Sequence, residues 1–273
     1  MSNLALDVGP AIYLRAFGGL LLRDTRVLAH TLGEFIGRTV TQPLLFVFVF
    51  AYLFPKIGQG ISGGSTGVSF GTILVPGLVA VSAVFNGIST VALPLAIEFG
   101  ATREIEDRAM SPLPVWAVGA EKIAFGAAQS LLSALVVFPL VYLIPATPVD
   151  VHVHNWLLLI VVVALACLTS GALGLTLGCL VRPDQIGLMF GLLVIPLSFL
   201  GCIYYPWAAL GPVRWLQILV LVNPLVYLSE GMRAALTPSL PHMATVAYLG
   251  ASIVIALILT IFGLNRFVHR VVS

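Results

Sequence analysis

Charge is the scarcest property of this sequence. Its 273 residues include 13 Lys and Arg and 11 Asp and Glu, so that 9% of the side chains are charged and 59% are hydrophobic. With a mean hydropathy of +1.08, the chain has too few polar side chains to cover a soluble globular protein. The formal net charge of +2 is also too small to indicate a nucleic-acid partner. The composition therefore predicts an integral membrane protein.

Several sequence motifs are also absent or out of context. The three cysteines fall in apolar segments and their odd number argues against a disulfide framework. No G-x-x-x-x-G-K-[ST] sequence is present to bind nucleotide phosphates. Residues 63–67 match the G-x-S-x-G pattern of serine hydrolases, but they lie in a glycine-rich loop without a preceding strand. We therefore expect no catalytic residue, metal site or cofactor on this chain. We also expect no cleaved signal peptide, because residues 1–10 contain no Lys or Arg.

Long apolar runs dominate what is present. A membrane-spanning helix needs about 20 mostly apolar residues, and six segments are close to that length. They lie near residues 39–54, 71–97, 122–144, 156–181, 186–205 and 243–264. We predict an all-α polytopic protein in which residues 1–273 form a single transmembrane domain. Residues 39–264 would form the six-span bundle, with residues 265–273 as a cytoplasmic tail.

The distribution of basic residues predicts the orientation of the chain. With six spans, ten basic residues lie on the side of both termini and three on the other side, which places the termini in the cytoplasm. Residues 213–236 are apolar enough to form a seventh span, but Asn223-Pro224 interrupts them and Glu230 and Arg233 follow. We interpret them as a re-entrant or surface-lying helical hairpin on the outer side, with Asn223 as cap and Pro224 as the first residue of its second helix.

Residues 1–38 precede the first predicted span. Residues 11–38 mix apolar side chains with arginines, which is typical of a helix lying in the membrane interface. We predict a cytoplasmic interfacial helix there. An ordinary flanking segment that only obeys the orientation rule is the alternative.

The most highly charged stretch lies between the second and third predicted spans. Six formal charges fall within residues 98–108, at Glu98, Arg103, Glu104, Glu106, Asp107 and Arg108. We predict a short amphipathic helix, because Thr102 can cap it, its acidic residues favour the positive end of a helix, and Pro112 can close it. On charge alone, a solvated turn is the competing interpretation.

Small residues at four-residue spacing occur in the fourth and fifth predicted spans. They are Ser170, Gly174 and Gly178, and then Gly187 and Gly191. Such spacing lets helices approach closely. Packing within one subunit is favoured over packing between two subunits, because most helix contacts in a six-span bundle are internal.

Taken together, these residues resemble the membrane permeases of ABC type-2 exporters, which include daunorubicin-resistance and nodulation-factor export subunits. The loop after the second span is similar at Glu98, Gly100, Thr102, Glu104, Ser111, Pro112, Gly119 and Lys122, although Ala101 separates Gly100 from Thr102. A later block is similar at Gly201, Tyr205, Pro206, Trp215, Asn223, Pro224, Tyr227, Glu230 and Arg233.

The resemblance implies that the charged stretch is a coupling helix that docks on a separate cytoplasmic ATPase. The residues that it places at this contact are Glu98, Gly100, Thr102, Arg103, Glu104, Glu106, Arg108 and Pro112. Two permeases, identical or different, and two ATPase domains binding ATP and Mg would form an exporter in the bacterial plasma membrane. This subunit would not itself be an enzyme.

The resemblance also implies that the second and fifth spans line a central path. Asn86, Ser89 and Ser198 are then candidate wall residues, although helix packing explains them equally well. An apolar wall with scattered polar groups suits an amphiphilic, drug-like, or lipid- or saccharide-linked substrate. The alternative function is a secondary carrier or a membrane scaffold without an ATPase. No predicted span has an acidic residue at its centre, which disfavours an ion-driven carrier.

Overall fold

The computed structural model describes residues 10–30, 32–57, 70–102, 113–144, 149 and 151–272. Most of the predicted coupling helix, namely Arg103, Glu104, Glu106, Arg108 and Pro112, and the glycine-rich residues 63–67 lie outside this part of the chain. Every regular element within it is a helix. Five helices are long and apolar enough to cross a membrane, or six if one bent pair counts as a single span. These features support an all-helical polytopic membrane protein.

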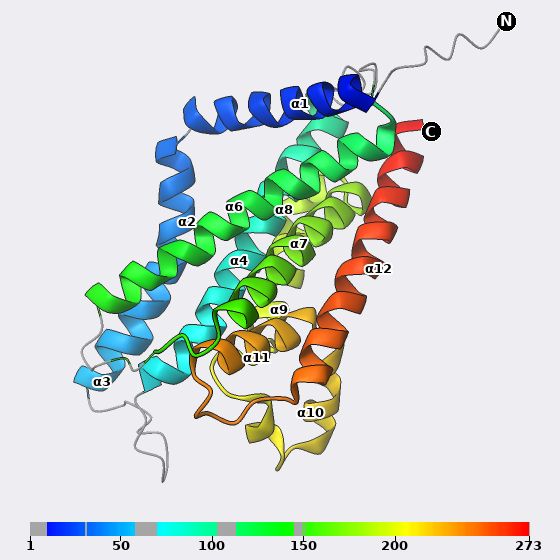
Figure 1. Ribbon diagram of the computed structural model, residues 1–273. Coiled ribbons are helices and arrows are strands. Elements are labelled where there is room, and N and C mark those ends of the chain that lie inside the picture. The colour runs from blue at the N-terminus through cyan, green and yellow to red at the C-terminus, as the bar shows by residue number, and fades with distance from the viewer. Residues whose placement is uncertain are drawn as a thin grey trace, which may run out of the picture.

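Four long helices form the body of the molecule (Figure 1). They are α4 (Phe70–Ile97), α6 (Val115–Leu143), α7 (Trp156–Leu180) and α12 (Thr245–Val272). α4 packs against α6 and α7, and α7 also packs against α12. In α4, 23 of the 28 residues are buried, whereas in α12 only 5 of 28 are buried. α4 is therefore the central helix, and α12 presents much of its surface to the surroundings.

Glycines allow α4, α6 and α7 to approach closely. A Cβ at Gly171 would lie 2.6 Å from the carbonyl oxygen of Ile123, and one at Gly174 would lie 2.8 Å from Val91. Gly178 likewise meets α4 at Leu95. The small-residue face predicted for the fourth span thus packs within the subunit. Among the residues that the structure describes, none would lie within 4 Å of a Cβ at Gly187, so this glycine makes no close packing contact with them.

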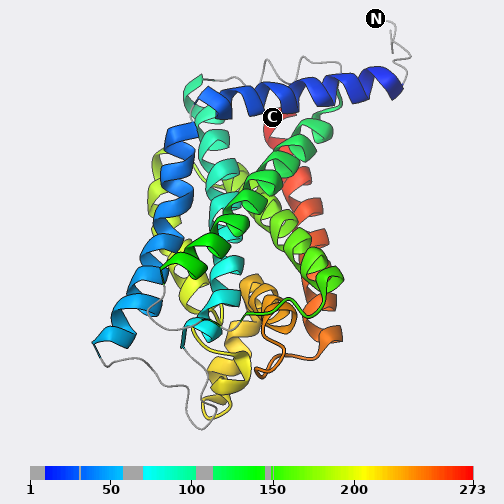
Figure 2. The same cartoon turned by 60° about the vertical axis from the view of Figure 1, so that its left-hand side comes forward.

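The first helix, α1 (Pro10–His30), lies across the end of the bundle at which α12 ends (Figures 1 and 2). After α1, the chain runs toward the opposite end of the bundle through three consecutive helices. They are α2 (Leu32–Phe46), the π-helix η1 (Val47–Leu53) and α3 (Phe54–Lys56). The candidate first span begins at Phe35, before the predicted start at Thr39. The 16 residues of the predicted first span, 39–54, are too few to cross a bilayer. The observed helix is longer because it includes residues that were assigned to the segment 1–38.

Three other helices also extend beyond their predicted limits. α6 begins at Val115 rather than Lys122, directly after Pro114, whose fixed φ is compatible with a helix start. The π-helix η3 (Glu98–Thr102) continues α4 past Ile97. α12 runs through Val272, so the predicted 265–273 tail is helical except for the undescribed last residue. Burial of Phe267 explains this extension, because it gives the end of α12 an apolar contact with the body.

The predicted fifth span, 186–205, is shorter than expected. After the single turn η4 (Pro183–Gln185), it consists of α8 (Ile186–Met189), η5 (Phe190–Val194) and α9 (Ile195–Phe199), of 4, 5 and 5 residues. At 1.5 Å per residue these rise about 21 Å, less than the roughly 30 Å of a bilayer core. The chain continues through a turn at residues 200–206 into η6 (Trp207–Leu210).

The predicted hairpin is present as a bent helix pair. Its first arm is α10 (Arg214–Leu219) with η7 (Val220–Val222), its second arm is α11 (Pro224–Leu236), and the two meet at 99°. Asn223 caps α11 and Pro224 opens it, as predicted. However, 11 of the 13 residues of α11 are buried, against α4, α7 and α12. The surface-lying alternative is therefore wrong for this arm.

Candidate functional site

The predicted coupling segment, residues 98–112, begins at a buried cluster of three charges. Lys122 Nζ on α6 lies 2.8 Å from Glu98 Oε1 on η3 and 3.5 Å from Asp24 Oδ2 on α1. All three residues are buried. Buried charges are costly unless they are paired, and here each carboxylate faces the same ammonium group. The cluster thus ties the start of the coupling segment to both α1 and α6.

Phe99, the next residue, connects the segment to α7 and α12. Its ring lies 6.1 Å from the ring of Phe267, edge to face, and 4.4 Å from the guanidinium carbon of Arg270. Arg270 Nη1 also donates to the carbonyl oxygens of Gly178, Cys179 and Val181. These are carbonyls at the C-terminal end of α7, where a cation is favoured. Arg270 therefore joins the C-terminal ends of α7 and α12. Its guanidinium group also contacts the ring of Phe99.

Both ends of the coupling segment rest on the same apolar cluster. Leu113, where the described chain resumes, is buried in this cluster together with Phe267, and Phe99 packs against it. A segment fixed at both ends on one surface can pass a force applied between them to that surface. Gly100 is exposed, and Thr102 is the last residue of η3. The roles predicted for these two residues and for Glu98 in binding the ATPase stay predictions.

The predicted path residues lie inside the subunit. Asn86 Nδ2 donates to Thr39 Oγ1 at 3.0 Å, and Asn86 Oδ1 accepts from Thr90 Oγ1 at 3.1 Å. Ser89 Oγ donates to the carbonyl oxygen of Asn86 at 3.0 Å. Ser198 is buried on α9. Asn86 thus joins α4 to α2, whereas the bond of Ser89 lies within α4, and the wall role of all three residues stays a prediction.

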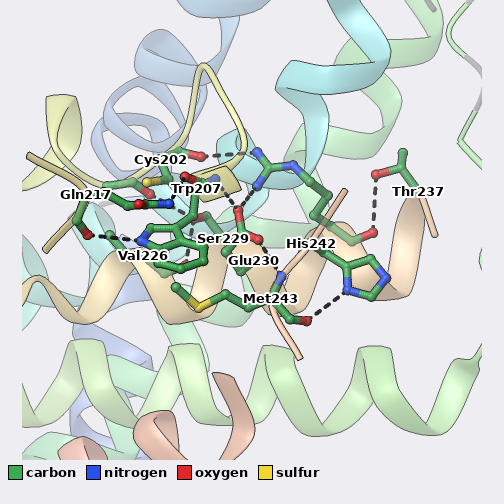
Figure 3. A network of polar contacts seen from close by, with 11 residues as sticks. Cys202, Trp207, Gln217, Val226, Ser229, Glu230, Thr237, His242 and Met243 are labelled. Carbon is green, nitrogen blue, oxygen red and sulfur yellow. Dashed lines mark hydrogen bonds and ion pairs between the residues drawn. The ribbon is translucent and has the colours of Figure 1, made fainter. Parts of the chain in front are cut away.

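A second buried polar network lies at the opposite end of the molecule, around Glu230 on α11 (Figure 3). Glu230 Oε1 accepts from the backbone N–H of Trp207 at 2.9 Å and from Arg233 Nη1. Glu230 Oε2 accepts from the backbone N–H of Met243 at 2.8 Å. Arg233 Nη2 donates to the carbonyl oxygen of Cys202 at 3.1 Å. Glu230 and Arg233 are both fully buried.

Other side chains of the hairpin bind carbonyl groups near the end of α9. Asn223 Nδ2 donates to Leu197 O and Ser229 Oγ donates to Gly201 O, each at 2.7 Å. These bonds satisfy backbone acceptors where the helix stops. In the sequence, Glu230 and Arg233 argue against a seventh span and belong to the block that resembles the family, but their pairing was not predicted. Their spacing of three residues on a helix was the available signal that they pair.

Comparison with known proteins confirms the resemblance seen in the sequence. The model of the ABC-2 type transporter family matches residues 18–237, a range that extends from α1 to just beyond the end of α11. The chain belongs to the ABC-2 type transporter family. It is similar to the inner membrane transport permease YadH of Escherichia coli K12, with 28% identity over 199 residues, 72% of this chain and 74% of that permease. The same values apply to the permease of that name from Shigella flexneri.

Family membership establishes the general role of this ABC-2 chain. It is a multi-pass membrane transport permease subunit of an ABC transporter, in agreement with its apolar helices. The family implies an ABC ATPase as partner, and its permease subunits are generally not catalytic.

Proposed function

We propose that this ABC-2 permease exports an amphiphilic, drug-like, or lipid- or saccharide-linked substrate from the cytoplasm, driven by an ATPase that docks on residues 98–112. The proposal is supported chiefly by the way Glu98 and Phe99 are held. Through Lys122, Asp24, Phe267 and Arg270 they contact α1, α6 and α12, and Arg270 extends this contact to α7. Force applied at this point reaches four helices.

The orientation in this proposal follows from the basic residues. α1, η3 and the C-terminal end of α12 lie at one end of the bundle (Figure 2), and this end carries the majority of the Lys and Arg. By the positive-inside rule, we infer that this end faces the cytoplasm of a bacterial cell. The exporter would contain a second permease, identical or different, and ATPase subunits that bind ATP and Mg. Residues 1–273 would act as a single transmembrane domain.

Co-purification tests the docking contact. We expect an ATPase to elute with the permease from detergent extracts of native membranes, and Glu104→Lys with Glu106→Lys to abolish this association by reversing two charges of the segment. Asp184→Lys is the control, because it reverses an exposed acid of η4 outside the coupling segment. Equal retention of the ATPase by both variants would contradict the proposed contact. Transport by the permease without any ATPase would indicate a secondary carrier.

Proline substitution tests whether η3 transmits force. Gly100→Pro or Thr102→Pro removes a backbone N–H and distorts η3, which is the first part of the segment 98–112. We expect normal membrane insertion and ATPase binding, but ATP hydrolysis that no longer produces export. Normal export by either variant would contradict a coupling role for η3.

A further inference from the structure

The Glu230 carboxylate joins three separate parts of the chain. It lies on α11 and accepts backbone N–H groups from Trp207, at the start of η6, and from Met243, in the connection before α12 (Figure 3). Buried N–H groups require an acceptor, and both of these find it in one side chain. Glu230 is therefore an acceptor for backbone groups as well as the ion-pair partner of Arg233.

Arg233 extends this connection to the turn after α9. It donates to the carbonyl oxygen of Cys202, which has a left-handed backbone with φ of 53°. A non-glycine residue adopts this conformation at a cost, so it must be held in place by its surroundings. The same turn packs tightly on α4, because a Cβ at Gly77 would lie 2.5 Å from Ile203 Cα. The hairpin and the turn are thus fixed to each other through Arg233 and Cys202.

α12 connects this network with the coupling segment. At one end, Met243 precedes the helix by two residues, and Tyr248 is buried beside Gly231 of α11. At the other end, Phe267 and Arg270 contact Phe99. A helix of 28 residues is about 42 Å long and its hydrogen bonds resist axial compression. α12 can therefore pass an axial displacement from one end of the molecule to the other.

We propose that α12 transmits movement of the coupling segment to the α10–α11 hairpin, and that Glu230 is the positioning residue that makes the hairpin follow α12. This inference rests on the proposed function, because Phe99 belongs to residues 98–112, on which the ATPase is proposed to dock. Without the Glu230 carboxylate, the start of α12 loses its bond to α11, and α11 loses its bond to η6. The hairpin then no longer moves with α12.

Two pairs of spin labels test this in the complete permease–ATPase complex in lipid vesicles. One pair, Trp215→Cys on α10 with Leu157→Cys on α7, reports on the hairpin; the other, Thr25→Cys with Trp116→Cys, reports on the cytoplasmic end. All four positions are exposed, and the native cysteines are buried. Distances are measured by electron paramagnetic resonance with and without ATP and vanadate. In the wild type we expect both distances to shift.

Glu230→Gln should abolish the shift of the hairpin pair and retain that of the cytoplasmic pair. An amide cannot accept both N–H groups, because its NH2 group would face one of them. The charge swap Glu230→Arg with Arg233→Glu should also abolish the hairpin shift, because arginine accepts no hydrogen bond. A simple ion pair would be restored by the swap. A hairpin shift retained by either variant would overturn the role of Glu230.

The opposite end of α12 provides an independent test if the Glu230 variants do not fold. Arg270→Gln should abolish the hairpin shift, whereas Arg266→Gln should retain it, because Arg266 is exposed and stacks on Phe262. Equal hairpin shifts in these two variants would overturn transmission by α12. A wild-type complex in which only the cytoplasmic pair shifts would do the same. Failure of the proposed function is distinct: the wild-type chain would then retain no ATPase, or neither pair would shift.

Discussion

At the scale of single residues, the buried charges depend on contacts between distant parts of the chain. Lys122 lies 24 residues from Glu98, and both belong to the motif that predicted a coupling segment. Asp24 was not predicted, because its partner is set by how α1 packs across the bundle. The sequence identifies which residues are charged in an apolar chain. It does not determine which of them meet.

Substitution of Lys122 should destabilise the permease strongly. Lys122→Met removes the ammonium group that the buried Glu98 and Asp24 carboxylates share, and removal of one partner from a buried ion pair costs about 3–5 kcal/mol. Unfolding of the purified protein in mixed micelles by sodium dodecyl sulfate measures this change. Lys56→Met is the control, because Lys56 is exposed and bonds only to Tyr52 among the contacts described, so we expect a change below about 0.5 kcal/mol.

Gly171 of α7 should be required for the close packing of α7 on α6. Gly171→Ala places a methyl group 2.6 Å from the carbonyl oxygen of Ile123, and overpacking of this kind costs about 1–3 kcal/mol. Gly187→Ala meets no atom of the described part of the chain within 4 Å and should leave stability unchanged or raise it slightly, because alanine is the better helix former. The same unfolding assay compares the two. Equal stability of both variants would contradict the close helix contact.

At the scale of helices, the sequence predicted the start of α11 but not its environment. Asn223-Pro224 is a local signal that does not depend on the rest of the fold. Burial of α11 depends on space between α4, α7 and α12, which hydropathy does not describe. The same limit explains the fifth span, where apolar residues continue to residue 205 but the helix ends at Phe199. Asn223 and Ser229 supply hydrogen bonds that let the backbone leave the helix there.

Asn223 should therefore contribute more to stability than an ordinary helix cap. Asn223→Ala removes the cap on the Leu225 N–H and also the bond to the Leu197 carbonyl. We expect a loss above the roughly 1 kcal/mol typical of a cap, because a partly buried carbonyl loses its donor as well. Asn155→Ala, which removes only the exposed cap of α7, is the matched control. An equal loss in the two variants, measured by unfolding in micelles, would show that the Leu197 bond contributes nothing.

At the scale of the whole molecule, the predicted orientation of the chain in the membrane can be tested by chemical labelling. In intact cells, a membrane-impermeant maleimide should react with Lys56→Cys and not with Thr25→Cys until the membrane is permeabilised. Both positions are exposed, at opposite ends of the bundle, and the native cysteines are buried. Reaction of Thr25→Cys in intact cells would place α1 outside and would contradict the proposed direction of coupling.

The contacts of α1 and α12 have a consequence for synthesis of the protein on the ribosome. Asp24 is made early, and its partner Lys122 emerges about a hundred residues later. Phe267 and Arg270, the partners of Phe99, emerge about 170 residues after Phe99. The ion pair between α1 and α6 therefore cannot form until α6 has been made. Phe99 therefore lacks both partners until α12 has been made. A chain that stops before α12 would lack these contacts, so in the proposed complex the ATPase would bind only copies that include α12.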